Sequence, residues 1–229
     1  MKKPIEAEIA YFRNFVTDEK NALFDRLIEE RSDYVTVVLE DLYQSHNQSA
    51  VMRTLDCAGV QDVYLIENRN SYDDTSTVSR GARAWLNLHR FNSHANNTGI
   101  ALKLLREKGY RIIATSPHYS GYTPDTLPLE AGKLAFCFGT EMTGLSREIL
   151  DSADGFIRVP MYGFTESLNV SVCAALIVYN VMERLRKSAV DWHLTEERKK
   201  EVLWDWYAHT IKSFEDIVRR FRADIKNTD

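Results

Sequence analysis

The sequence predicts an α/β protein whose mostly parallel sheet carries helices on both faces. Three observations support this class of fold. Short runs of apolar and β-branched residues recur along the chain, segments with apolar residues at helical spacing separate them, and glycines stand at several of the junctions. An alternation of strands and helices of this kind is typical of parallel sheets.

The first half of the chain contains three predicted helices and three predicted strands. Thr17 or Asp18 can cap the first helix. The first strand, Tyr34–Leu39, is rich in β-branched residues and apolar nearly throughout, as in a strand buried on both faces. Gly59 and Gly109 end the other two helices. In order, we expect a helix up to Arg31, strand Tyr34–Leu39, helix Ser49–Cys57, strand Val63–Ile66, a polar loop Asn68–Ser79, helix Ala95–Lys108 and strand Arg111–Thr115.

The second half contains two further strands and ends in helices. We expect strand Leu134–Phe138, a short helix near Ser146–Ala153, strand Phe156–Val159 and a mostly buried helix Ser167–Lys187. From Thr195 to Ile225 apolar residues recur at spacings of three and four, which predicts a long amphipathic helix that packs on the domain or on a second subunit. The expected organisation is a central domain, 34–188, with helical extensions over 1–33 and 189–229.

The composition is that of a globular protein. With 44% hydrophobic and 27% charged residues among 229, the chain has enough apolar mass for a packed core. No apolar run approaches the roughly 20 residues that cross a bilayer, and Met1–Ala10 lacks the apolar centre of a signal peptide. We therefore expect a cytoplasmic protein with no membrane partner.

The formal net charge of −4 argues at first against a nucleic-acid partner. Phosphate binding requires only a local basic face, however, so the net charge does not exclude RNA. The cysteines Cys57, Cys137 and Cys173 lie in apolar stretches without metal-ligand spacing. This pattern favours buried free thiols and predicts no metal site.

Three polar segments each follow a predicted strand, at the edge where open α/β sheets bind ligands. In the first segment, Glu40–Arg53, if Asn47 caps the helix, Arg53 lies about one and two-thirds turns further on, and both can border one pocket. An ordinary helix cap followed by a solvent-exposed arginine also explains this segment when it is taken alone.

The second segment, Phe138–Ser146, joins a strand to a helix through Gly139 and Gly144. Glycines at a strand end allow a ligand to approach the backbone closely. The chain has neither a phosphate-loop lysine nor a dinucleotide fingerprint, which argues against a nucleotide-dependent oxidoreductase. Glu141 can contribute to a site or simply face the dipole of the following helix.

The third segment, Val159–Ser171, carries Ser167 and Asn169 at a helix start. Hydroxyl and amide groups commonly cap backbone N–H groups there, and capping is a sufficient explanation for either residue alone. All three segments lie at strand ends of one sheet, however, so we expect their side chains to meet.

Together the three segments resemble the motifs of the SPOUT methyltransferases, most closely those of the TrmH branch. The residues that carry the resemblance are Ser45-His46-Asn47, Ala50, Arg53-Thr54, Phe138-Gly139-Thr140-Glu141, Gly144-Leu145-Ser146, Val159-Pro160-Met161, Gly163 and Ser167-Leu168-Asn169-Val170-Ser171. The resemblance spans about Val35 to Lys187. It implies a C-terminal deep trefoil knot, a homodimer with active sites at the subunit interface, and methylation of an RNA ribose 2′-hydroxyl by S-adenosylmethionine.

The same resemblance implies roles for individual residues. The positions that bind the methyl donor through backbone groups are Thr115, Gly139, Val159 and Leu168, and the catalytic positions are Asn47, Arg53, Glu141, Ser167 and Asn169. In the mechanism proposed for the family, Arg53, polarised by an RNA phosphate, accepts or relays the hydroxyl proton. Arginine is a poor base, so phosphate binding is the role that we favour for it. No metal is required, because the sulfonium is the electrophile.

Arg184 and Arg186 are the candidates for RNA contact, although they lie one residue further along the helix than the two arginines of TrmH relatives, about 100° of helical rotation. A short N-terminal and a long C-terminal extension also resemble TrmH, which implies methylation of guanosine 18 in the tRNA D-loop. Two alternatives stay open, namely another tRNA or rRNA ribose as the substrate, and a non-catalytic RNA-binding protein that retains the knot.

Overall fold

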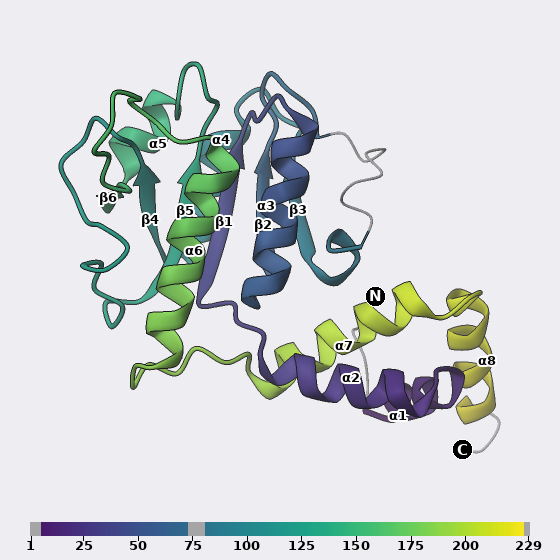
Figure 1. Cartoon of the computed structure of the whole chain (residues 1–229). Coiled ribbons are helices and arrows are strands. Elements are labelled where there is room, and N and C mark those ends of the chain that lie inside the picture. Colours follow the sequence, from purple (N-terminus) through teal and green to yellow (C-terminus); the bar gives the residue numbers. More distant parts are fainter. Residues whose placement is uncertain (1–5, 73–80, 227–229) are drawn as a thin grey trace. The chain divides into compact units, whose positions relative to one another are not determined.

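The structure is a computed structural model that describes residues 6–72 and 81–226 (Figure 1). The chain divides into two compact units. One contains the residues up to Arg31 together with those from His193 onward, and the other spans Ser32–Trp192. The N- and C-terminal segments, which the sequence analysis treated as separate extensions, therefore belong to one unit.

The Ser32–Trp192 unit is built on a six-stranded sheet with the order β3-β2-β1-β5-β4-β6. Each pair of neighbouring strands in it runs parallel. The strands are β1 (Val35–Glu40), β2 (Asp62–Ile66), β3 (Asn87–Phe91), β4 (Tyr110–Thr115), β5 (Lys133–Phe138) and β6 (Gly155–Ile157). The predicted α/β class with a parallel sheet is confirmed, and the parallel direction brings the carboxyl ends of all six strands to one edge.

Helices cover both faces of this sheet (Figure 1). On one face lie α3 (Ser45–Ala58) and α6 (Val170–Arg186), and on the other lie α4 (Asn97–Glu107) and α5 (Arg147–Ser152). A short 3-10 helix, η2 (Arg83–Trp85), precedes β3.

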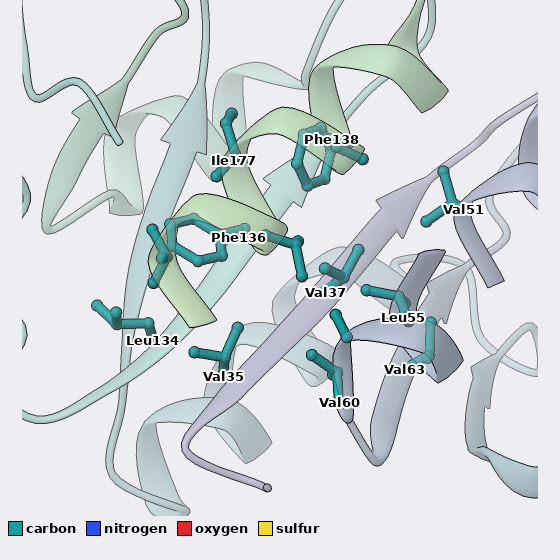
Figure 2. Close-up of a cluster of buried hydrophobic side chains, with 14 of the residues drawn as sticks. Val35, Val37, Val51, Leu55, Val60, Val63, Leu134, Phe136, Phe138 and Ile177 are labelled. Atoms are coloured by element: carbon teal, nitrogen blue, oxygen red, sulfur yellow. The ribbon is translucent and has the colours of Figure 1, made fainter. Parts of the chain in front are cut away.

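Each face of the sheet has its own hydrophobic core. Side chains of β1 alternate between them, so that Val35 and Val37 pack with α3 and α6 while Val38 packs with α4 and α5. Figure 2 shows Phe136 of β5 next to Ile177 of α6. Because strands and helices are fully buried at these contacts, the loops at the carboxyl edge start from fixed positions.

Two elements of this unit differ from the sequence predictions. Strand β3 was not predicted, because it is a half-exposed edge strand with only two strongly apolar residues. Helix α3 begins at Ser45 instead of Ser49, since its first turn is polar and lacks the apolar spacing that marks the rest. Gln44 is the N-cap residue, so the prediction that Asn47 caps this helix is wrong. The part of the predicted loop Asn68–Ser79 from residue 73 on lies outside the described residues.

The other unit is helical. It contains α1 (Glu6–Phe12), the 3-10 helix η1 (Arg13–Phe15), α2 (Asp18–Glu29), α7 (Glu196–Thr210) and α8 (Phe214–Lys226). Aromatic rings form its core, with Phe24 5.2 Å from Trp206 and 5.3 Å from Tyr207 between ring centroids. Trp206 and Tyr207 are buried and pack this core.

The long helix predicted from Thr195 to Ile225 is divided in two. Ser213 has a φ of 55°, a left-handed conformation that a continuous right-handed helix cannot contain. The break lets α8 turn back, so that Phe214 packs 4.7 Å from Phe12 of α1. Hydrophobic spacing continued across the break, which is why the sequence pattern did not reveal it.

Candidate active site

A cavity of about 440 Å³ opens at the carboxyl edge of the sheet. Its walls come from the ends of β4, β5 and β6 and from the loops that follow them. This size is typical of pockets that bind small molecules. The four residues predicted to bind the methyl donor all line it, namely Thr115, Gly139, Val159 and Leu168.

The glycine loop, which we define as Gly139–Gly144, forms one wall. Thr140 and Gly144 donate their backbone N–H groups to each other's carbonyl oxygens, at 3.1 and 3.0 Å. A Cβ atom on Gly139 would stand 2.2 Å from the carbonyl oxygen of Gly144. Gly144 itself has a φ of 67°. The sequence therefore needs glycine at both ends of this loop, one for close backbone approach and one for its dihedral angle.

Thr115, at the end of β4, uses its side chain within the sheet. Its Oγ1 donates to the carbonyl oxygen of Cys137 at 2.8 Å. The hydroxyl proton of Thr115 is therefore used within the sheet. Thr115 also lines the cavity, which is consistent with the backbone role that the family resemblance implies.

Three of the predicted catalytic residues meet at the rim of the cavity. The Nδ2 atoms of Asn47 and Asn169 both donate to Oε1 of Glu141, at 2.8 and 2.9 Å. Asn169 Nδ2 also donates to Oδ1 of Asn47 at 3.1 Å. These residues come from α3, from the glycine loop and from the start of α6. The expectation that the three loops meet is thus confirmed for this cluster, which we call the amide–carboxylate cluster.

Neighbouring groups determine the orientation of both amides. The backbone N–H of Ser171 donates to Oδ1 of Asn169 at 2.9 Å, so the Asn169 NH₂ group must point toward Glu141. Asn47 Nδ2 has a second acceptor in Oε1 of Gln44, at 2.8 Å. Asn169 is therefore both the N-cap residue of α6 and a member of the cluster.

One carboxylate oxygen of Glu141 is left for another partner. Both amide hydrogen bonds go to Oε1, and Oε2 accepts no hydrogen bond from any of the residues that the structure describes. Glu141 is exposed and lines the cavity. A carboxylate held by one oxygen presents the other in a defined direction, ready to accept a hydrogen bond from a bound molecule.

The two remaining catalytic candidates are placed differently. Ser167 is exposed and lines the cavity next to Leu168. Arg53 is exposed on α3, the helix that also carries Asn47, and it does not line the cavity within this chain. The structure therefore brings Ser167 to the cavity and leaves Arg53 on the neighbouring surface.

The candidates for RNA contact lie at the other end of α6. The guanidinium of Arg184 donates to the carbonyl oxygens of Pro124 and Leu127, and that of Arg186 donates to Ala58 at 2.9 Å. Both arginines thus tie α6 to neighbouring backbone. They are not part of the amide–carboxylate cluster.

Some lining residues were not singled out from the sequence. They include His118, Arg158 and Cys173. The first two follow β4 and β6 at the carboxyl edge, a position that could have marked them, while Cys173 was recognised only as a buried thiol. Burial raises the pKa of Cys173 to about 11 and also raises that of Cys137, so both thiols are neutral at physiological pH.

The described part of the chain contains neither a membrane-spanning helix nor a metal-binding cluster. None of its helices is long and apolar enough to cross a bilayer. Its histidine, cysteine, aspartate and glutamate side chains form no group of three or more that could hold a metal ion.

A small-molecule cavity at the carboxyl edge of a parallel sheet, rimmed by a carboxylate and two amides, is typical of α/β enzymes that bind a cofactor. More specifically, the chain belongs to the SpoU rRNA Methylase family, whose model matches residues 34–179. The protein is therefore a methyltransferase.

Named relatives align along most of the chain. A tRNA (guanosine(18)-2′-O)-methyltransferase of Borreliella burgdorferi is 37% identical over 217 residues, which cover 95% of this chain and 97% of that protein. A protein of the same name from Thermus thermophilus is 31% identical over 199 residues, 83% of this chain and 96% of that one.

Solved structures share the fold. The A. aeolicus TrmH/SpoU tRNA modifying enzyme superposes with a TM-score of 0.72 at 23% identity and covers 86% of this chain and 98% of its own. The SpoU methyltransferase AviRb from Streptomyces viridochromogenes, solved in complex with the cofactor AdoMet, has a TM-score of 0.58 at 23% identity, over 72% of this chain and 62% of that one.

Gly139→Ala tests the role of the glycine loop. The added methyl group would collide with the Gly144 carbonyl, so the loop must open, and we expect the dissociation constant for S-adenosylmethionine to rise more than about tenfold. Gly81→Ala is the matched control, because a Cβ there meets no atom within 4 Å. Calorimetric titration of both variants measures the effect, and equal affinities would contradict it.

Proposed function

We propose that the protein transfers a methyl group from S-adenosylmethionine to the ribose 2′-hydroxyl of guanosine 18 in the D-loop of tRNA. The observation that carries the proposal is the amide–carboxylate cluster at the rim of a cofactor-sized cavity. The substrate is supported by the Borreliella burgdorferi and Thermus thermophilus relatives, whose names specify this nucleotide and whose lengths this chain nearly matches. A role on tRNA also favours a cytoplasmic location.

The cavity suits the proposed cofactor. Its volume of about 440 Å³ and its walls of strand-end backbone, at Thr115, Gly139, Val159 and Leu168, can hold the adenine and ribose of S-adenosylmethionine through backbone groups. When bound, the cofactor supplies a methyl group on a positively charged sulfonium. The carboxylate of Glu141 lines this cavity. Its negative charge attracts a positively charged sulfonium, and its oxygens can accept a hydrogen bond from a hydroxyl group.

The cluster prepares one carboxylate oxygen for the ribose. A 2′-hydroxyl is a weak acid and a poor nucleophile, so it must be oriented and must lose its proton during transfer. With Oε1 of Glu141 held by Asn47 and Asn169, Oε2 accepts the hydrogen bond of the hydroxyl. Arg53 binds an RNA phosphate next to the ribose, a role that suits a guanidinium better than proton abstraction. Ser167 contributes a hydroxyl group to the lining of the cavity.

A second copy of the chain completes the functional unit in this proposal. Val172, Leu176 and Tyr179 of α6 are 45, 46 and 59% exposed, and their spacing of four and three residues puts them on one helical face. Tyr162 and Phe164, in the loop that leads to α6, are fully exposed as well. Exposed apolar side chains on one helical face and in the loop before it, close to a site, favour a homodimer with active sites at the interface. The segment from β6 to α6 is the part that we expect to form the deep trefoil knot.

RNA contact by Arg184 and Arg186 also stays within the proposal. The guanidinium of Arg184 has five N–H donors and uses two of them on the carbonyl bonds described above, which leaves donors for a phosphate. The alternative substrates are another tRNA or rRNA ribose, and the alternative role is RNA binding without catalysis.

Methyl transfer from tritiated S-adenosylmethionine to unmodified tRNA transcripts tests the function directly. We expect label in the transcripts, and mapping should place it on the ribose of guanosine 18. A transcript with a 2′-deoxy nucleotide at this position should accept no label. Label at another nucleotide would contradict the proposed substrate, and failure to bind the cofactor would contradict the enzyme.

Arg53→Ala should lower the turnover number by roughly 100-fold or more while the affinity for S-adenosylmethionine changes little, because Arg53 lies outside the cavity. Arg53→Lys is the matched control, since it keeps the charge but loses the planar fork that grips a phosphate. We expect partial activity in this variant. Full turnover in Arg53→Ala would overturn the assigned role, and single-turnover assays at saturating cofactor measure it.

Leu176→Asp should dissociate the proposed dimer, because it places a charge in the middle of the apolar face of α6. Ile100→Asp on α4, which is 40% exposed on the opposite side of the sheet, is the control and should leave the assembly unchanged. Sedimentation equilibrium of both variants reports the mass. A dimeric Leu176→Asp variant, or a monomeric parent protein, would refute this interface.

A further inference from the structure

Glu40, the last residue of β1, carries a carboxylate that is buried but not part of the amide–carboxylate cluster. Its exposed fraction is 3%. Oε2 accepts the backbone N–H of Ser146 at 2.7 Å, and Oε1 accepts the hydroxyls of Ser146 and Thr98 at 2.7 and 2.8 Å. A buried carboxylate is costly unless it is hydrogen-bonded, and this one has partners on both oxygens.

One of the two partners, Ser146, lies just after the glycine loop in the chain. Ser146 follows the glycine loop by two residues and is the N-cap residue of α5, where its Oγ accepts the N–H of Ile149. Thr98 belongs to the first turn of α4, which contributes no residue to the cavity. Oε1 of Glu40 thus binds the hydroxyl of Ser146, which is next to the glycine loop, and the hydroxyl of Thr98, which is on a helix outside the cavity.

The glycine loop is stiff enough to transmit the position of Ser146. Its ends are joined by the two backbone bonds between Thr140 and Gly144, and the Thr143 N–H also donates to Thr140 Oγ1 at 3.0 Å. The backbone of Gly139 is packed closely against that of Gly144. A loop closed in this way moves as one piece, so its direction is set by the residues that anchor it.

We propose that Glu40 is a positioning residue for methyl transfer. Through Ser146 it anchors the glycine loop from inside the protein, while Asn47 and Asn169 hold Glu141 from the outer side. Glu40 contacts neither the cavity nor the cluster. It acts by fixing the position of the glycine loop, which contacts the cofactor and carries the Glu141 carboxylate that binds the ribose. This inference rests on the proposed function.

A glutamine cannot replace this carboxylate. The backbone N–H of Ser146 can only donate, so it requires an oxygen, and the amide NH₂ would then face the two hydroxyls. The Thr98 hydroxyl oxygen already accepts Nδ2 of Asn68 at 2.8 Å. At least one hydrogen bond must therefore be lost or rearranged in Glu40→Gln.

Two hydroxyl deletions separate positioning from stability. Ser146→Ala and Thr98→Val each remove one hydroxyl from Oε1 of Glu40, and we expect similar falls in the urea midpoint. We expect the dissociation constant for S-adenosylmethionine to rise about fivefold or more in Ser146→Ala and less than about twofold in Thr98→Val. Ser146→Thr, which keeps the hydroxyl, should restore affinity. Equal cofactor affinities in the two deletions would overturn the proposal.

The double variant Glu40→Gln with Ser146→Ala tests whether the two residues act together. If Glu40 works through Ser146, the losses of cofactor affinity are less than additive, whereas additive losses mean that Ser146 is only a helix cap and refute the proposal. Cofactor binding is measured without RNA, so it stays informative if the tRNA nucleotide is another one. A parent protein that does not bind S-adenosylmethionine would instead refute the proposed function itself.

Discussion

The parallel pairing of β1 with β5 is the constraint on which the site depends. It aligns Leu39 with Phe138, so the two strands end side by side and release their loops at the same edge. The loop after β1 leads to Asn47, and the loop after β5 carries Glu141. Since β5 also pairs with β4, the end of β4 with Thr115 stands on the other side of the same cavity. An antiparallel partner would send one of these loops to the opposite edge.

The sheet is rigid because both of its faces are buried, and this rigidity allows short polar contacts to define the site. Asn47, Glu141 and Asn169 are separated by long stretches of sequence but make hydrogen bonds of 2.8 to 3.1 Å with one another. Such contacts hold their geometry only if the elements that carry them do not move. The packing of α3 and α6 against the same sheet face provides this support.

The two carboxylate oxygens of Glu141 differ in their hydrogen-bond partners. Oε1 accepts hydrogen bonds from two amides and fixes the loop, while Oε2 accepts none from the residues that the structure describes. The buried carboxylate of Glu40 also fixes this loop. It joins the end of β1 to Ser146, which follows the glycine loop.

Local chemistry was enough to predict much of this protein from its sequence. The apolar run of β1, the glycines at 139 and 144 and the polar residues after each strand report their own environment, so strands, loops and candidate residues could be recognised. Contacts between distant residues were not encoded locally. The first turn of α3 is polar because Asn47 faces Glu141, the carbonyl partners of Arg184 come from another loop, and the left-handed Ser213 interrupts an unbroken apolar pattern. Only the tertiary structure decided these features, because each depends on which groups the packed sheet and helices bring within hydrogen-bonding distance.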